Sequence, residues 1–375
     1  MKHPKTTLLI FGILILIAFD LILTVGVRLA LKGTIEKRPL GNPAKIRIQH
    51  PVYHHGLKPN SFSNQERWGP QTYSVFVNSL GFRDKEIRNI PPATNKFRIV
   101  FMGDSFTEGP GMDFEDTFVG ILSDQYADKN IEVLNAGIGS YAPTVYYIKT
   151  LYLINELKLK FDHVVVCLDI SDIQDEAINY GIANGVVTAR IDSFPYTTKM
   201  FIHDYTTIGR LIQHYSLKAY SHLTHPYSET LRTQREKDLS IGKIRSSWTI
   251  HKEIYEEYGK KGLEQAKIRL QSLYELLHPL GISLTLVVYP YPDQIINHDL
   301  DSIQVRFWKE WSQEHDVNFI NIFPAFIKPN ETELAAEETI RKHYFQGDDH
   351  WNKEGHSLVA QNIAEGLQQI GIPPQ

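Results

Sequence analysis

The stretch FRIVFMGDSFTEG, residues 97–109, joins a run of strand-forming apolar residues to Gly103, Asp104 and Ser105. The run predicts a buried strand, and the residues after it predict a tight turn into a helix. Ser105 would lie at that turn, where the free N–H groups at the start of the helix can stabilise an oxyanion. The stretch therefore makes Ser105 a candidate nucleophile, with a plain helix N-cap as the alternative role.

The chain beyond this stretch continues to alternate strand and helix patterns. Continuous Val, Ile and Leu runs between amphipathic helices indicate a parallel sheet that is covered on both faces. We therefore expect an α/β fold whose site lies at the carboxyl ends of the strands, where such sheets bind ligands. Further strands are expected at 131–137, 163–170, 283–290 and 318–323, and helices at about 118–126, 143–157, 250–277 and 353–369.

The composition excludes several classes of protein. The 375 residues are 42% hydrophobic and 22% charged, which is typical of a folded chain rather than a disordered one. The net charge of -4, without a run of like charges, argues against nucleic-acid binding. Cys167 is the only cysteine, so an internal disulfide and a thiolate metal cluster are excluded. We expect neither a metal ion nor a cofactor.

The chain divides into an anchor, a linker and one large domain. Residues 6–27 are apolar apart from Asp20 and are long enough to span a bilayer, so they predict an uncleaved transmembrane helix. Residues 33–95, rich in Pro, Asn and Gly, are interpreted as a linker with lead-in strands. Residues 96–372 form the expected α/β domain. An insertion at about 171–247 is expected to be mostly helical and to cover the site or recognise substrate.

A second local pattern, DDHWN at 348–352, supplies a base for the serine. A serine nucleophile needs a base to take its proton, and His350 is suited to that role at neutral pH. Asp348, two residues earlier, can orient the imidazole and stabilise its charged form, with Asp349 as the second choice. The alternative is a solvated loop in which Asp349 or Asn352 caps the following helix.

Two further strand ends carry candidate residues. Gly137, at the end of the expected strand 131–137, would let the backbone approach a substrate and donate its N–H, although an ordinary turn glycine is the alternative. Tyr289 and Tyr291 lie at the end of the strand expected at 283–290 and could stack on a sugar, or they could be buried beside a proline-fixed turn. We place Trp351 with them as a candidate substrate-binding residue.

Taken in order, GDSFTEG, NAGIGS and DDHWNKEGH resemble the SGNH/GDSL family of serine esterases and acyltransferases, over about residues 97–370. The resemblance implies a three-layer α/β/α sandwich with a parallel sheet, similar to the flavodoxin-like folds. It also implies Ser105 as nucleophile, His350 as base and Asp348 as acid, the last by the D-x-H-W spacing of members linked to polysaccharide O-acetylation. Ser105 and Gly137 would supply oxyanion N–H groups.

One position departs from the family pattern. The family's third oxyanion donor is an asparagine after the third strand, whereas this chain has LDISD at 168–172. Ser171 aligns best with that asparagine, and its hydroxyl could donate one hydrogen bond. Loss of an oxyanion donor costs on the order of 10²–10³ in rate. An ionised Asp169 beside the oxyanion would lower the rate further, so the departure bears on hydrolysis rather than on the fold.

The resemblance implies removal or transfer of short acyl groups, acetyl above all, on a cell-envelope or exported polysaccharide. Water as the acceptor would make the chain an esterase, and a sugar hydroxyl would make it an O-acyltransferase. The alternative is a weakly active or inactive glycan-binding subunit, docked through its anchor to a membrane acyltransferase. Asp20 within the span and the missing oxyanion asparagine motivate this alternative, although Asp20 could equally reach the lipid headgroups.

The two indications of topology disagree. More Lys and Arg residues follow the expected span than precede it, which would place the large domain in the cytoplasm. The resemblance, to bacterial membrane-anchored members, implies a periplasmic or extracellular domain on a single-pass anchor. We expect the second arrangement, because long domains translocate largely regardless of nearby charge.

Overall fold

The computed structural model describes residues 46–190 and 232–373, together with scattered positions between 11 and 22. The anchor expected at 6–27 and the centre of the expected insertion lie largely outside these residues. None of the helices within the described ranges is long and apolar enough to cross a membrane. The chain divides into two units, and the fold below is that of the larger one, Ala44–Ala189 with Arg232–Gln375.

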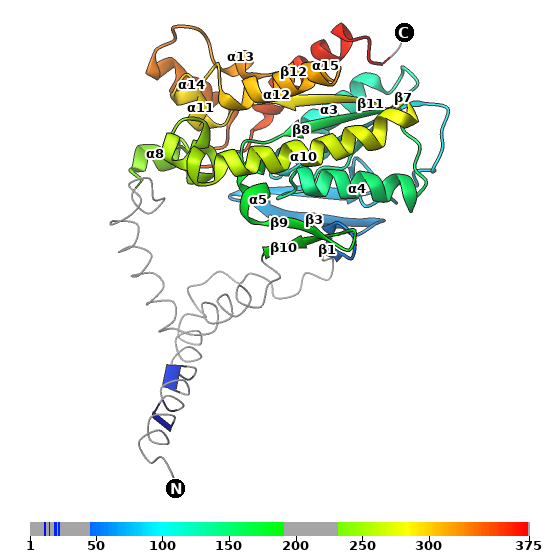
Figure 1. The fold of residues 1–375 in the computed structure, drawn as a ribbon, viewed down its shortest axis with the longest axis horizontal. Coiled ribbons are helices and arrows are strands. Elements are labelled where there is room, and N and C mark those ends of the chain that lie inside the picture. The colour runs from blue at the N-terminus through cyan, green and yellow to red at the C-terminus, as the bar shows by residue number, and fades with distance from the viewer. Residues whose placement is uncertain are drawn as a thin grey trace. The chain divides into compact units, whose positions relative to one another are not determined.

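The centre of this unit is an eight-stranded sheet in the order β12-β11-β8-β6-β7-β5-β4-β3 (Figure 1). Its five parallel strands are the five that the sequence predicts. They are β6 (Phe97–Gly103), β7 (Ile131–Asn135), β8 (His163–Leu168), β11 (Ser283–Val288) and β12 (Asn318–Asn321). The chain runs from β6 to β7 on one side and then returns past β6 to β8. The loop after β6, which carries Ser105, therefore lies at the topological switch point, where open α/β sheets bind ligands.

The sheet is mixed, which corrects the expected purely parallel one. Three strands of the expected lead-in region continue it antiparallel beyond β7: β3 (Ser61–Trp68), β4 (Gln71–Val77) and β5 (Arg83–Asp84). Short turns join these strands, and a short turn can connect only antiparallel neighbours. They also cover the edge that β7 would otherwise expose. Two small hairpins lie outside the sheet: β1 (Arg47–His50) with β2 (His54–Leu57), and β9 (Tyr180–Ala183) with β10 (Val186–Ala189).

Helices cover both faces of the sheet. The β6-to-β7 and β7-to-β8 connections run in opposite directions along the sheet, so right-handed crossovers place α3 (Phe118–Tyr126) and α4 (Pro143–Asn155) on opposite faces. The long helix α10 (Lys260–Leu277) packs beside α4, in front of the sheet in Figure 1, and the last helix, α15 (Lys353–Gln369), packs against α3. The fold is therefore the expected α/β arrangement with helices flanking a large, mostly parallel sheet.

One expected helix is divided into segments, and several further helices lie between the elements that the sequence predicts. The helix expected at 250–277 is α9 (Lys252–Ile254), a π-helical turn (Tyr255–Gly259) and α10 in succession. The described part of the insertion holds the β9–β10 hairpin as well as helices, so in this part it is less helical than expected. The other helices are α2 (Ser105–Glu108), α5 (Asp172–Ile178), α8 (Gln234–Asp238), α11 (Pro292–Ile296), α12 (Ile303–Glu314), α13 (Phe323–Phe326) and α14 (Glu333–His343), with 3₁₀ turns at Phe114–Asp116, Ile244–Thr249 and His278–Leu280.

Candidate active site

Ser105 lies at a tight turn between β6 and the short helix α2. Asp104 caps this helix, because its carboxylate accepts a hydrogen bond from the Phe106 N–H over 2.9 Å. A Cβ atom at Gly103 would lie 2.1 Å from Thr107 Oγ1, so the close return of the chain requires glycine there. Within the described residues, the Ser105 N–H has no hydrogen-bond acceptor. The turn thus presents both a hydroxyl and a free donor at the sheet edge.

The structure brings Ser105, His350 and Asp348 together in one hydrogen-bonded chain. His350 Nε2 lies 2.8 Å from Ser105 Oγ, and His350 Nδ1 lies 2.5 Å from Asp348 Oδ1. Asp348 Oδ1 also accepts the backbone N–H of His350 over 2.9 Å. Because the carboxylate can only accept, the Nδ1 proton lies toward it and Nε2 is left to accept the serine proton. This is the arrangement that activates a serine.

Two aromatic rings hold the His350 imidazole in place. Phe106 stacks on one side with ring centroids 4.8 Å apart, and Trp68 meets the ring edge-on, also at 4.8 Å. Trp68 Nε1 donates a hydrogen bond of 3.0 Å to Asp348 Oδ2. Sequence reasoning missed Trp68, because it comes from β3, in a segment interpreted as a linker with lead-in strands.

Asp349 lies beside the same imidazole with a different main partner. Its carboxylate pairs with Lys243 Nζ at 3.0 Å and is 3.4 Å from His350 Nδ1. Burial alone would raise the pKa of Asp349, but its electrostatic interactions with His350, Lys243 and Arg245 outweigh burial and hold the pKa well below its usual range. Of the two carboxylates, Asp348 is therefore the direct partner of the histidine, and Asp349 is a buried charge satisfied by Lys243.

Gly137 does not present its N–H to a substrate in this structure. That N–H donates to Asn135 Oδ1 over 3.1 Å, and Asn135 Nδ2 in turn donates to the Thr107 carbonyl over 2.7 Å. A Cβ at Gly137 would lie 2.6 Å from Thr107 Cβ, so glycine is needed for the loop to pack on α2. The oxyanion role expected of Gly137 therefore lacks a free donor, because the preceding asparagine takes the N–H.

The glycine beside the nucleophile is Gly139. A Cβ there would lie 3.6 Å from Ser105 Cβ. The Gly139 N–H donates to Glu108 Oε2 over 2.7 Å, and its carbonyl lies 2.9 Å from His55 Nε2. Burial lowers the pKa of His55 to about 4, so the neutral ring donates from Nε2 to the carbonyl. The peptide groups on both sides of Gly139 are therefore held, and the next residue, Ser140, adopts a left-handed φ of 66°.

Charged groups support the same loop from behind. Glu108 is buried and pairs with Arg47 of β1. Lys149 of α4 is buried among aromatic rings and donates to the Ala136 carbonyl over 2.8 Å. Burial lowers the pKa of Lys149 to about 7. The loop after β7 is therefore positioned by residues from β1, β2, α2 and α4.

The loop after β8 places Ser171 at the same edge, with its hydroxyl accepting a hydrogen bond from Arg245 Nη2. The Ser171 N–H donates to Asp169 Oδ1 at 2.5 Å, and the Tyr291 hydroxyl donates to the same carboxylate at 2.7 Å. Asp169 is therefore compensated by two donors and by the nearby guanidinium. Arg245, which belongs to the insertion, was not anticipated from the sequence.

Asp104, Asp169 and Asp172 form a buried acidic cluster behind the nucleophile. One oxygen from each lies within 4.8 Å of the others, a spacing that could hold a cation. Burial first, and then the charge of Asp169, raises the pKa of both Asp104 and Asp172 well above the usual range. The hydroxyls of Tyr146 and Tyr291 donate hydrogen bonds to Asp172 and Asp169 of this cluster.

The three aromatic residues expected to bind substrate are buried instead. Tyr289 and Tyr291 are 1% exposed and Trp351 is 0% exposed. Their rings pack around Phe106, at centroid distances of 5.3, 5.1 and 4.6 Å. Their position in the core means that they support the serine turn and have no surface for stacking on a sugar.

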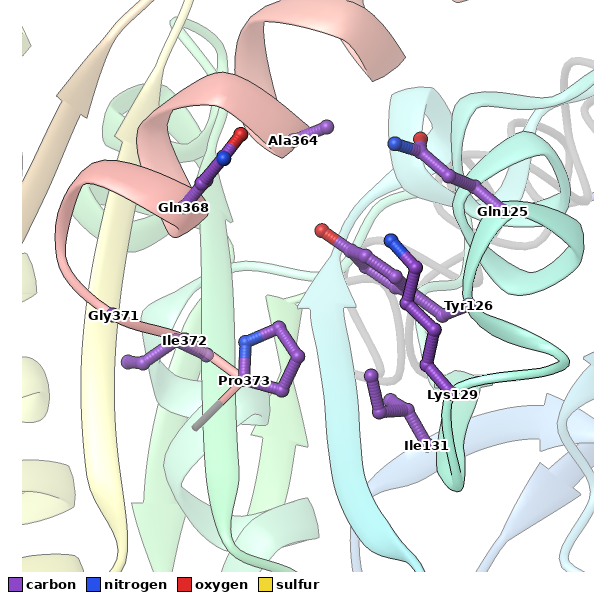
Figure 2. A pocket seen from close by; sticks show the side chains of 9 residues that line it. All are labelled: Gln125, Tyr126, Lys129, Ile131, Ala364, Gln368, Gly371, Ile372 and Pro373. Atoms are coloured by element: carbon purple, nitrogen blue, oxygen red, sulfur yellow. The ribbon is translucent and has the colours of Figure 1, made fainter. Parts of the chain in front are cut away.

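A pocket of about 360 Å³ lies at the opposite end of the strands, near the amino end of β7 (Figure 2). Tyr126 and Lys129, at the end of α3, face Gln368 and Pro373 at the end of α15, beside Ile131 at the start of β7. Ser105 follows the carboxyl end of the parallel neighbour β6. The pocket is therefore separated from the candidate triad by the length of the strands.

No family model matches the chain, and no curated protein matches its sequence. Among solved structures, the acetylxylan esterase Axe2 from Geobacillus stearothermophilus is 14% identical, with 76% of this chain and 97% of that chain covered and a TM-score of 0.39. A member of the lipolytic protein G-D-S-L family from Veillonella parvula is 13% identical, with 72% and 97% covered and a TM-score of 0.37. The esterase EstA from a Pseudoalteromonas species is 11% identical, with 73% and 97% covered and a TM-score of 0.36.

These neighbours are of the kind that the GDSFTEG, NAGIGS and DDHWNKEGH motifs resemble. All three TM-scores lie below 0.5.

Proposed function

We propose that this chain is a serine esterase that forms an acyl-enzyme on Ser105. The observation that carries the proposal is the unbroken series of contacts from Ser105 Oγ through His350 to Asp348, at 2.8 and 2.5 Å. The hydrogen bond from His350 Nδ1 to Asp348 leaves Nε2 to accept the serine proton, and the carboxylate is placed to stabilise the positive charge that then forms.

The reaction follows from these positions. Ser105 Oγ attacks the ester carbonyl while its proton passes to His350 Nε2, which gives a tetrahedral oxyanion. His350 then returns the proton to the leaving alcohol oxygen as the carbon–oxygen bond of the ester breaks. A water or a sugar hydroxyl next attacks the acyl-enzyme, losing its proton to His350, and the same proton is returned to Ser105. Asp348 stays ionised throughout and stabilises the imidazolium.

The proposed substrate is a short-chain ester, above all an acetyl ester, on a cell-envelope or exported polysaccharide. The half-buried rings of Trp68 and Phe345 support this choice. They flank Gly111, where a Cβ would lie 3.5 Å from Trp68 Cβ and 3.1 Å from the Phe345 ring. Partly exposed aromatic rings beside a triad offer the flat apolar face that a sugar ring can pack on. We further propose that the N-terminal segment anchors the chain in a bacterial membrane with this domain outside the cytoplasm.

The test uses the full-length chain with p-nitrophenyl acetate. The expected result is release of nitrophenol that disappears in Ser105→Ala and persists in Ser357→Ala, which removes an exposed serine of α15. Intact-mass measurement should detect one acetyl group on the protein and none on Ser105→Ala. Faster turnover on addition of an oligosaccharide, with acetylated sugar as product, would assign acyl transfer rather than hydrolysis. Equal release by Ser105→Ala and the unmodified chain would overturn the proposal.

One observation favours a second candidate, a glycan-binding subunit with little activity of its own. The Gly137 N–H is taken by Asn135, and the asparagine expected as a third oxyanion donor is replaced by Ser171. An accessory subunit of a membrane acyltransferase would keep the fold with such a weakened oxyanion site. In cells, it should tolerate Ser105→Ala without loss of polysaccharide acetylation, whereas the enzyme should not.

A further inference from the structure

We propose that Arg245 and Ser171 act as one unit, in which the guanidinium polarises the Ser171 hydroxyl and that hydroxyl donates to the oxyanion. This inference deepens the proposed esterase function and rests on it. Ser171 is then a catalytic residue, since it touches the reacting oxygen. Arg245 is a positioning residue, because it acts through Ser171.

The sheet places Ser171 on the flank of the nucleophile opposite the β7 loop. Strand β6 lies between β7 and β8, and Gly103 of β6 pairs with Cys167 of β8. Ser105 lies two residues after Gly103, and Ser171 lies four residues after Cys167. Phe106, next to Ser105, packs its ring 5.1 Å from that of Tyr291, which follows β11, and the Tyr291 hydroxyl lies 3.3 Å from Ser171 Oγ.

The hydrogen-bond partners of Ser171 leave its proton available. Its Oγ accepts from Arg245 Nη2, so the hydroxyl hydrogen must point elsewhere. The Tyr291 hydroxyl lies 3.3 Å from Ser171 Oγ, on the donor side of that contact, so the Ser171 hydrogen meets no acceptor among the described residues. Tyr291 already gives its own proton to Asp169, over 2.7 and 2.8 Å. The long contact with Tyr291 is weaker than a hydrogen bond to a developing oxyanion would be.

The charge of Arg245 makes this donor stronger. A hydroxyl that accepts a hydrogen bond from a cation becomes a better donor, because the bonds polarise one another. Burial alone would lower the pKa of Arg245, but Tyr291, Asp349 and Asp169 outweigh it and raise the pKa, so the guanidinium stays charged. The same charge offsets Asp169, which would otherwise oppose negative charge at this edge.

The test measures how fast Ser105 reacts with a p-nitrophenyl alkylphosphonate. A bond forms between Ser105 Oγ and phosphorus, and the bond from phosphorus to the nitrophenolate oxygen breaks. His350 takes the serine proton. The adduct places a negatively charged oxygen where the oxyanion would be, and the reaction needs no turnover. The single variants are Ser171→Ala, Ser171→Asn and Arg245→Gln. The two double variants combine Arg245→Gln with Ser171→Ala or with Ser171→Asn. Arg235→Gln, which removes an exposed arginine of α8, is the matched control.

Each variant has a distinct expected result in the full-length chain. Ser171→Ala should slow phosphonylation on the order of 10²-fold, the usual cost of one oxyanion donor. Arg245→Gln should slow it on the order of 10-fold or more, and the double variant should be no slower than Ser171→Ala. Ser171→Asn should react at near the original rate with or without Arg245, because an amide N–H donates without help from a cation. The same pattern should appear in kcat for p-nitrophenyl acetate, with KM little changed.

Two failures are distinguishable. If Ser105 does not react with the phosphonate in the unmodified chain, the proposed esterase function is overturned, and the relay with it. If Ser105 reacts and the costs of Ser171→Ala and Arg245→Gln multiply in the double variant, the relay alone is overturned. If Arg245 had only a structural role, Arg245→Gln would slow phosphonylation equally in the unmodified chain and in Ser171→Asn. It would also lower the midpoint of unfolding in both.

Discussion

Trp68 Nε1 donates a 3.0 Å hydrogen bond to Asp348 Oδ2, joining an antiparallel strand near the start of the domain to a loop near its end. The same indole meets the His350 ring edge-on. One oxygen of Asp348 is thus held by the histidine and the other by the tryptophan, so the carboxylate is fixed in the plane where it orients the imidazole. The strands that continue the sheet beyond β7 therefore reach the candidate triad directly.

Replacing Trp68 tests this contact. Trp68→Phe keeps an aromatic edge near His350 and removes the donor to Asp348, whose side chain is 31% exposed and can recruit water instead. We expect kcat for p-nitrophenyl acetate to fall about 3- to 10-fold, the equivalent of a hydrogen bond worth about 1 kcal/mol, with little change in KM. Phe62→Leu, on the exposed side of the same strand, is the control. An unchanged kcat in Trp68→Phe would show that Asp348 is held without the indole.

The two neighbouring carboxylates should differ sharply. Asp348→Asn removes the charge that stabilises the imidazolium and favours the wrong tautomer, so kcat should fall on the order of 10³–10⁴-fold. Asp349→Asn leaves that contact intact and removes the partner of Lys243, so the fall in kcat should be at least ten times smaller. Steady-state kinetics of both variants, with thermal unfolding as the folding control, makes the comparison. A larger loss in Asp349→Asn would move the acid to Asp349.

The ion pair between Arg47 and Glu108 should stabilise the domain above acidic pH. Burial would raise the pKa of Glu108, but Arg47 and the Gly139 N–H outweigh it and lower the pKa below its usual 4.5. The folded state therefore binds this proton less readily than the unfolded chain. The stabilisation is present above about pH 4.5 and is lost as the pH falls through the folded value.

Arg47→Met should leave a buried carboxylate poorly paired. We expect a loss of about 1–3 kcal/mol in the free energy of unfolding at pH 7, and acid unfolding that begins at higher pH. Arg235→Met breaks exposed pairs with Glu333 and Glu337 and should change the free energy by less than about 1 kcal/mol. Urea denaturation across pH measures both. Identical acid transitions in Arg47→Met and the unmodified chain would contradict the role given to this pair.

Lys149 gives a pH dependence of the same sign as Glu108, but in a higher pH window. Its pKa falls from 10.5 to about 7 on burial, so above pH 7 the folded chain has released a proton that the unfolded chain keeps until near pH 10.5. Stability should therefore rise with pH in this window, with a slope of up to ~1.4 kcal/mol per pH unit. Lys149→Met should remove that slope and raise stability at pH 6, whereas the exposed Lys129→Met should not. Denaturation curves that keep the same slope in Lys149→Met would contradict the prediction.

The parts of the fold and site that the sequence predicted are local. The five parallel strands, the helices at 118–126 and 353–369, and the pair Asp348 and His350 depend on residues close together in the chain, so their spacing is visible in the sequence. Trp68, His55 and Arg245 reach the site from distant elements. Nothing in their immediate surroundings distinguishes them from other aromatic, histidine or arginine residues, because their contacts exist only after the sheet has formed.

The sequence by itself determined the alternation of strands and helices, placed Ser105 at a strand end and paired Asp348 with His350, since these follow from hydrophobic periodicity and short-range spacing. The Asp348–His350 pair itself follows helix α14 rather than a strand. The tertiary structure decided which groups are free to act. In the folded chain the Gly137 N–H donates to Asn135, and the side chains of Tyr289, Tyr291 and Trp351 are buried. Antiparallel strands extend the parallel sheet, and Arg245 lies within hydrogen-bond distance of Ser171. Burial and hydrogen-bond satisfaction depend on which distant segments pack together, and that is a property of the whole fold rather than of any one stretch of chain.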